Sequence, residues 1–296
     1  MSYDLYLIPK VFDTKAIRAF FEGRLHYQVG DSQAVYDNED TGVYFIFDTV
    51  AVAGIYDEEE AGRAPHVALN LNYYRPHIFA LEAEPEVAAF VQAFTCSVFD
   101  PQVDGMEDGI YSRERFLAGW TKGNRFGVQA ISQQNGEAPL VADPRQIEEA
   151  WAWNYRRGEL QERLGENVFV PKVIWLLPMQ GLAPVRCVTW TFGAPTMIPE
   201  TLITHIVLVR QKRPSLKKMF ARRDAESEAE IKLLSVENGI RLRGLERGEM
   251  DGRSVIQTPV TGPLEVQALF SGDWPKPQFQ VLPPEAVLGN DLVDWK

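Results

Sequence analysis

The sequence predicts an α+β protein of two mixed domains, in which antiparallel-rich sheets are flanked by helices and the second half is mainly β. Three observations support this fold class. The chain has 296 residues, a length that favours two domains over one. Hydrophobic residues make up 45% of it and charged residues 24%, as in packed globular proteins. Helical and strand patterns alternate in the first half, whereas strand patterns dominate after residue 165.

A strand and a helix are the first predicted elements. Residues 3–8, YDLYLI, are rich in the side chains that strands favour. Residues 13–24, DTKAIRAFFEGR, open with Asp13, a good N-cap residue, and their apolar side chains have helical spacing. The apolar side chains on one face of this helix are Ile17, Phe20 and Phe21.

Residues 36–47, YDNEDTGVYFIF, place a row of oxygen-bearing side chains before an apolar run. That row is Asp37, Asn38, Glu39 and Asp40. Because side chains alternate between the faces of a strand, the four do not converge on one ion unless the turn folds them together. Asn, Asp and Gly are also the residues that turns prefer, and Gly42 tolerates a positive φ. We therefore predict a hairpin with strands at 34–36 and 43–47 and the acidic row at its tip.

The remaining first half alternates strands and helices. HVALNLNYY (66–74) has the alternation of a strand, and Pro85 is expected to begin the next helix. TCSVF (95–99) predicts a strand, and Ser112 is a plausible cap for a further helix. SQQNGEAPLVA (132–142) has neither periodicity and is interpreted as a linker.

The second half begins with one helix and continues as strands. Asp143 and Pro144 form a cap and first turn, and Gly165 is expected to close that helix. The strand-rich runs that follow are 168–177, 184–192 and 201–210, with weaker runs at 253–260 and 279–283. The predicted domains are therefore an N-terminal α+β domain, 1–142, and a C-terminal β-rich α+β domain, 143–296.

Charge and cysteine content restrict the compartment and the partners. The formal net charge is −11, which disfavours contact with phosphate backbones, so we expect no nucleic-acid partner. Cys96 and Cys187 lie far apart in apolar runs, so we predict two free, buried thiols, as are usual in proteins of the reducing cytosol. The N-terminus lacks the basic region of a signal peptide, and no apolar run reaches the ~20 residues of a membrane span. We expect a cytoplasmic protein without a transmembrane segment.

The common catalytic and cofactor motifs are missing from the sequence, so no catalytic residue, cofactor or metal is predicted. DPQVDGMEDGIY (100–111) superficially resembles a calcium loop. Asp100, Gln102, Asp104 and Gly105 occupy its positions 1, 3, 5 and 6. Tyr111 occupies position 12, where calcium needs a bidentate glutamate. We interpret the segment as an acidic loop that precedes a helix.

NLNYYRPH (70–77) is the candidate for a polar ligand pocket. Asparagine is disfavoured in strands, yet two asparagines stand two residues apart on one face of the predicted strand. The candidate pocket residues are Asn70, Asn72, Tyr74, Arg75 and His77. The competing interpretation is the solvent-facing side of an antiparallel sheet.

RQKRPSLKKMFARR (210–223) is a basic block without any acidic residue. Its candidate contacts with an acidic partner or an anionic surface are Arg210, Lys212, Arg213, Lys217, Lys218, Arg222 and Arg223. Basic side chains around a short apolar stripe are typical of membrane-surface or acidic-partner sites. A solvated connection between strands is the competing interpretation, and it is favoured over membrane-surface contact.

Three stretches carry a family resemblance: MSYDLYLIPK (1–10), YDNEDTGVYFIF (36–47) and NYYRPHIFALEAEPEVAAFV (72–91). They resemble a family of uncharacterised bacterial cytosolic proteins with an MSYDLY-like start and a Y-x-N-E-D-T-G-V-Y-F hairpin. The resemblance covers the first half of the chain and extends faintly into the second. It implies a bacterial cytosolic protein, but no established activity, cofactor or catalytic residue.

Two functions of different class remain open. The favoured one is a non-catalytic protein-binding protein, of the immunity or adaptor type, whose acidic surface meets a basic partner. The alternative is an enzyme or small-molecule binder that uses the polar residues of 70–77 at a cleft between the domains.

Overall fold

The structure is a computed structural model with two compact units. It describes residues 1–49, 65–102, 105–106, 108–135, 138–179, 183–211, 229–236, 245–259, 264–274 and 278–293. Unit 1 comprises Met1–Ile147 and Pro284–Lys296, and unit 2 comprises Glu148–Pro283. Both units combine helices with antiparallel strands, so the fold class is α+β, as predicted. In the part of the chain that the structure describes, no helix is both long and apolar enough to cross a membrane.

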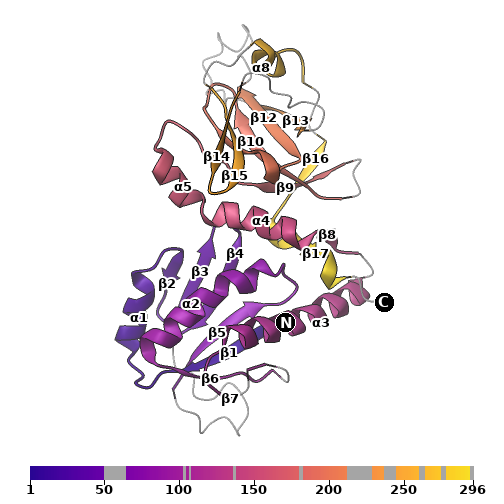
Figure 1. Ribbon diagram of the computed structural model, residues 1–296. Coiled ribbons are helices and arrows are strands. Elements are labelled where there is room, and N and C mark those ends of the chain that lie inside the picture. Colours follow the sequence, from indigo (N-terminus) through magenta and orange to yellow (C-terminus); the bar gives the residue numbers. More distant parts are fainter. Residues whose placement is uncertain are drawn as a thin grey trace, which may run out of the picture. The chain divides into compact units, whose positions relative to one another are not determined.

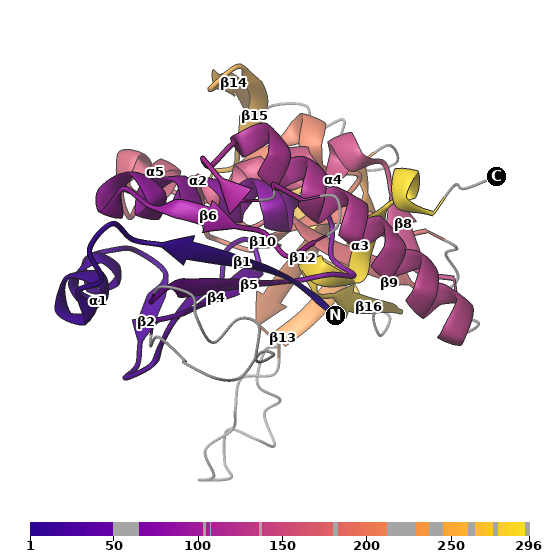
Figure 2. The same ribbon diagram turned by 90° about the horizontal axis from the view of Figure 1, so that it is seen from below.

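Unit 1 is built on a seven-stranded sheet whose hydrogen-bonded neighbours are all antiparallel. Its strand order is β2 (Tyr27–Val29), β3 (Gln33–Asn38), β4 (Val43–Asp48), β5 (Val67–Asn72), β1 (Ser2–Ile8), β6 (Ser97–Phe99) and β7 (Asp108–Gly109). The helices of this unit include α1 (Thr14–Glu22), α2 (Ile78–Phe94) and α3 (Arg113–Asn135). In Figure 1, α2 and α3 lie in front of the sheet and α1 lies beside it, next to β2; in Figure 2, α2 and α3 lie on one side of β1, β4 and β5.

The core of unit 1 lies between the sheet and these helices and combines aliphatic side chains with a group of stacked and tilted aromatic rings. Phe47 on β4 packs against Phe21 of α1 and Phe90 of α2, with ring centroids 5.0 and 6.0 Å away. Along β4, Val43, Phe45 and Phe47 are buried and the residues between them are half-buried. This alternation confirms the predicted hairpin, because β3 and β4 pair in register from Gln33↔Asp48 to Asn38↔Val43.

The predicted start of the second helix is wrong. We expected Pro85 to begin it, but α2 runs from Ile78 to Phe94 with Pro85 in its interior. A proline there has no N–H for the carbonyl of Leu81, a defect that usually ends a helix. The burial of Ile78 and Phe79 before the proline, and of Val87 after it, keeps both halves on the sheet.

The predicted linker at 132–142 is also wrong. Helix α3 continues to Asn135, and Leu140–Ala142 forms the strand β8. Its partner is β17 (Val287–Gly289), with which it pairs in parallel although about 145 residues separate them along the chain. The short helices η2 (Pro284–Ala286) and η3 (Asn290–Leu292) flank β17. Val128 of α3 packs with Leu288 and Leu292, so this distant segment completes the core of unit 1.

Unit 2 is mainly β, as predicted for the second half. A five-stranded sheet has the order β13 (Ala229–Ser235), β12 (His205–Gln211), β10 (Val185–Thr191), β9 (Ile174–Pro178) and β16 (Phe279–Leu282). Within it β10 and β12 are parallel and the other pairs antiparallel. A second sheet has the order β11 (Met197–Pro199), β15 (Arg253–Gln257) and β14 (Glu246–Met250), and η1 (Glu200–Leu202) follows β11.

The helical segment that opens the second half consists of two helices, whereas we expected one. Helix α4 (Pro144–Tyr155) spans the boundary between the units, and α5 (Arg157–Leu164) follows it. Asp143 caps α4 by accepting from Arg145 N at 2.8 Å, and Gly165 closes α5 with a φ of 71°. Both end signals were therefore correct, and only the break at Arg156 was missed. A further helix, α8 (Leu264–Leu269), lies near the end of unit 2.

Candidate functional site

The hairpin of residues 36–47 is locked onto a buried glutamate. Glu82, in the second turn of α2, is 1% exposed. Its Oε1 accepts hydrogen bonds from Tyr36 Oη at 2.8 Å, from Asn38 Nδ2 at 2.7 Å and from Thr41 Oγ1 at 3.0 Å. All three donors belong to the hairpin, so one carboxylate of α2 fixes both the strand β3 and the turn that follows it.

The same lock separates the hairpin side chains into two sets. Tyr36 and Asn38 are buried, whereas Asp37 and Glu39, which alternate with them along the chain, are exposed. Gly42 has a φ of 73°, the left-handed conformation that we expected at the turn. The acidic row is thus divided: Asp37 and Asn38 belong to β3, and only Glu39 and Asp40 lie in the turn at the tip. We call the exposed carboxylates Asp37 and Glu39 the hairpin acids. The sequence did not reveal the role of Glu82, because a glutamate on a helix is normally solvated.

Further carboxylates of unit 1 accept hydrogen bonds from tyrosines. On α2, Glu84 accepts from Tyr111 Oη at 2.9 Å and Glu86 from Tyr27 Oη at 3.1 Å. Burial, together with the neighbouring Glu86, raises the pKa of Tyr27 well above its ordinary value. Burial and Glu84 raise the pKa of Tyr111 in the same way. These phenols therefore stay protonated and act as permanent donors, so the pairs stabilise the fold.

The loop that resembles a calcium site uses its first carboxylate internally. Asp100, 3% exposed, accepts from Gln102 N at 3.0 Å, from Met106 N at 2.8 Å and from the hydroxyl of Tyr3. Gly105 is needed there, because a Cβ at this position would lie 2.0 Å from Asp100 Oδ2. Asp104 lies outside the described residues. Across the residues that the structure does describe, no group of three or more His, Cys, Asp or Glu side chains has the arrangement of a metal site.

The five candidate pocket residues all lie in unit 1, on β5 and on the segment that joins it to α2. On β5, Asn70 Nδ2 donates to Asp4 Oδ1 across the β1–β5 pair at 2.6 Å, and Asn72 is half-buried two residues further on. Tyr74, with a φ of 61°, packs on the cluster of Val128, Leu288 and Leu292. His77 is half-buried and directly precedes α2.

Arg75 is held by contacts within unit 1. Its Nη2 donates to Tyr44 Oη at 2.6 Å, and its guanidinium lies 5.8 Å from the ring centroid of Phe79. Its backbone exchanges two hydrogen bonds with the buried Asn124: Arg75 N donates to Oδ1 at 3.2 Å, and Nδ2 donates to Arg75 O at 2.8 Å. Asn70 and Arg75 thus contribute to the fold itself, and any ligand would have to compete with these contacts.

Of the basic block, only Arg210 and the backbone of Gln211 fall within the described residues. The candidates Lys212, Arg213, Lys217, Lys218, Arg222 and Arg223 lie outside them. Arg210 Nε donates to Glu230 Oε2 at 2.7 Å, and its Nη1 and Nη2 donate to the carbonyls of Phe270 and Gly272 at 2.6 and 2.7 Å. Its charge is therefore compensated within unit 2.

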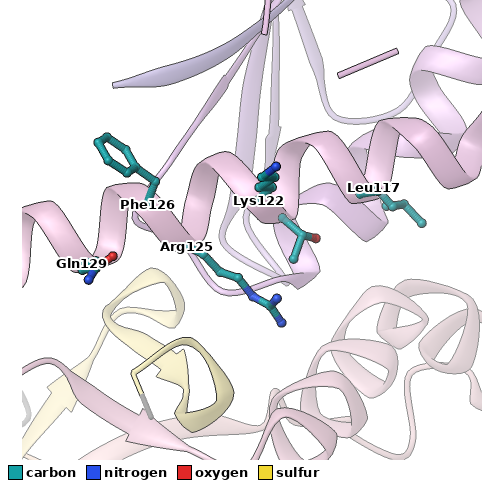
Figure 3. Close-up of a pocket in the computed structure, with 7 residues that line it drawn as sticks. Leu117, Lys122, Arg125, Phe126 and Gln129 are labelled. Atoms are coloured by element: carbon teal, nitrogen blue, oxygen red, sulfur yellow. The ribbon is translucent and has the colours of Figure 1, made fainter. Parts of the chain in front are cut away.

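One side of α3 lines a hollow (Figure 3). The α3 residues that line this hollow are Leu117, Ala118, Thr121, Lys122, Arg125, Phe126 and Gln129. Phe126 is 68% exposed. The opposite side of α3 carries Gly119, Gly123 and Gly127, where Tyr3 and Tyr73 approach the helix closely. On each side of α3 the residues recur every three or four positions, and this helical spacing is visible in the sequence.

The negative charge of the protein is concentrated in unit 1. Counted over the full sequence, unit 1 contains 25 acidic and 12 basic residues, a formal charge of −13, and unit 2 contains 16 acidic and 18 basic residues, a formal charge of +2. The hairpin acids belong to the acidic unit. Comparisons of the chain with protein-family models, with curated proteins and with solved structures found no match.

Proposed function

We propose that this chain is a non-catalytic, cytoplasmic protein-binding protein whose unit 1 binds a basic protein partner through the hairpin acids. The observation that carries this proposal is the charge separation between the units, −13 against +2. A strongly negative unit attracts and orients a positively charged protein before contact, and repels nucleic acid.

The Glu82 lock supports the choice of the hairpin as the contact surface. A loop that is mobile before binding loses conformational freedom on binding, at a cost of about 1–2 kcal/mol per residue. Three hydrogen bonds to one buried carboxylate already hold this turn. Asp37 and Glu39 are therefore presented in a fixed geometry, and the partner does not have to order them.

The experiment is affinity capture with charge-reversed variants. The immobilised chain is exposed to a lysate of the cells that encode it, at low and high ionic strength, and bound proteins are quantified by mass spectrometry. We expect one stoichiometric basic protein that dissociates at high salt. In the double variant Asp37→Lys/Glu39→Lys its capture should fall by about tenfold or more, because like charges then face each other.

The matched control is Glu162→Lys/Glu166→Lys. Both glutamates are exposed in unit 2, and the change in net charge is the same. The control should capture the partner like the original chain. Recovery of no stoichiometric partner, recovery of an acidic one, or equal capture by the hairpin variant would contradict the proposal.

A further inference from the structure

Unit 2 contains a cavity of about 850 Å³ between α8 and the neighbouring strands β10, β12 and β13. The described residues that line it are Thr191, Phe192, Arg210, Glu230, Leu264, Gln267, Ala268, Phe270, Ser271 and Gly272. This volume lies within the range of ~300–1,000 Å³ that is typical of small-molecule sites. Nothing in the proposed partner binding of unit 1 uses it.

One part of the cavity wall is aromatic and aliphatic, formed by Phe192, Leu264, Ala268 and Phe270. Phe192, directly after β10, is 52% exposed, and its ring centroid lies 5.1 Å from that of Phe270. Phe270 is itself held by Trp190, edge to face at 5.2 Å. Leu264 on α8 is 81% exposed. Such exposed apolar side chains around a hollow are the usual lining of a site for a ligand with an apolar body.

The charged groups of this lining neutralise each other. Arg210 and Glu230 form an ion pair at 2.7 Å, with side chains 20% and 30% exposed. The Arg210 guanidinium also lies 4.2 Å from the ring centroid of Trp274 and donates to two carbonyls. A cationic ligand would have to compete with Arg210 for Glu230, and an anionic ligand would have to compete with Glu230 for Arg210. The cavity therefore disfavours a ligand with a net charge.

Polar groups remain that could orient a neutral ligand. Glu230 uses Oε2 for the ion pair, and no hydrogen bond to Oε1 occurs in the described part of the chain. Thr191 adds an uncharged polar side chain to the lining, whereas the Ser271 hydroxyl donates to Ala268 O at 2.8 Å. Polar groups beside an apolar patch fix the orientation of a bound small molecule.

From these contacts we infer that unit 2 binds an uncharged small molecule that has an aromatic or aliphatic body and an amide-like polar group. The apolar body lies between Phe192, Phe270 and Leu264, and the polar group faces the Arg210–Glu230 pair.

Three probes of equal size and different charge test the inference: benzamide, benzoate and benzylamine. Binding to the full chain is measured by titration of its tryptophan indole NMR signals, because Trp190 and Trp274 pack against residues of the cavity wall. We expect benzamide to bind with a Kd of about 1 mM, as suits a ligand of this size. Benzoate and benzylamine should bind at least about tenfold more weakly.

Two variants place the binding in the cavity. Phe192→Ala removes the exposed ring, and Ala268→Phe inserts a ring from an exposed position of α8, so both should fold. Each should weaken benzamide binding by about tenfold. The control is Phe169→Ala, because Phe169 is 47% exposed in the same unit and does not line the cavity. Absence of benzamide binding up to its solubility, equal affinity for the three probes, or unchanged binding in Ala268→Phe would overturn the inference.

Discussion

Replacing Glu82 by Ala should loosen the hairpin and destabilise unit 1 by a large fraction of a typical folding free energy. The substitution leaves three buried donors, on Tyr36, Asn38 and Thr41, without their acceptor. Each unsatisfied buried donor costs about 1–3 kcal/mol, so three give about 3–6 kcal/mol after allowance for partial relaxation. Domains are typically stable by ~5–15 kcal/mol, so the variant should be close to unfolding at 37 °C.

The assay is urea unfolding followed by circular dichroism, with hydrogen-exchange mass spectrometry of residues 36–47 to localise the effect. Glu82→Gln, which keeps one carbonyl acceptor, should lose less stability than Glu82→Ala. A double-mutant cycle sharpens the test. Tyr36→Phe should cost about 1.5–3 kcal/mol in the original chain. In the Glu82→Ala background it should cost almost nothing, because the hydroxyl that it removes has already lost the Glu82 acceptor. A loss below about 1 kcal/mol for Glu82→Ala, or additive costs in the cycle, would refute this account of the lock.

Three further substitutions or conditions have definite expected outcomes. Gly123→Ala should destabilise unit 1 by about 1–3 kcal/mol in urea unfolding, because its Cβ would lie 2.1 Å from Tyr73 Oη, whereas Gly158→Ala, with nothing within 4 Å, should not. Pro85→Ala should stabilise by about 1–2 kcal/mol in the same assay, since it restores a backbone donor inside α2. Burial raises the pKa of the Cys187 thiol to about 12, so Cys187 should resist a thiol reagent at pH 8 until urea unfolds the protein.

The raised thiol pKa also fixes the direction of a pH dependence. The pKa of the Cys187 thiol is about 12 in the native protein, against an ordinary value of 9.0 for an exposed thiol, so the native state binds this proton more tightly than the unfolded chain does. This contribution to stability is complete below about pH 9 and is lost as the pH rises toward about 12. Cys187→Ser should flatten that part of the stability curve in urea titrations between pH 8 and pH 11. An unchanged slope in Cys187→Ser would contradict the predicted pH dependence. Rapid labelling of the native protein would contradict the burial of the thiol, and a stable Gly123→Ala variant would contradict the predicted clash with Tyr73.

The features that the sequence predicted correctly depend on neighbours along the chain. The cap of α1 is one example, since Asp13 Oδ1 accepts from Lys15 N at 2.9 Å and from Ala16 N at 3.2 Å. The turn at Gly42 is another, because its positive φ follows from the local preference of glycine. Both are set within a few residues, where propensity and capping dominate.

The features that were missed depend on residues far apart in the chain. Pro85 looked like a helix start, and only the burial of Ile78 and Phe79 on the sheet shows why the helix begins earlier. Residues 140–142 showed no strand periodicity, because their partner β17 is distant in sequence. Glu82 gave no signal at all, since its three donors come from a hairpin about 40 residues earlier. The cavity of unit 2 is likewise lined by residues that are spread along the chain from 191 to 272.

The pairing of β8 with β17 has a consequence for the order in which the protein matures. A ribosome synthesises all of unit 2 between these two strands, so unit 1 lacks β17 and its Leu288 and Leu292 contacts until the last part of this sequence has emerged. Val128 and Tyr74 lack these packing partners during that interval. Unit 2, whose residues are contiguous, can fold first. Unit 1 thus begins synthesis first and is completed last, and shortening the chain before residue 284 should trap it in an unfinished, aggregation-prone state.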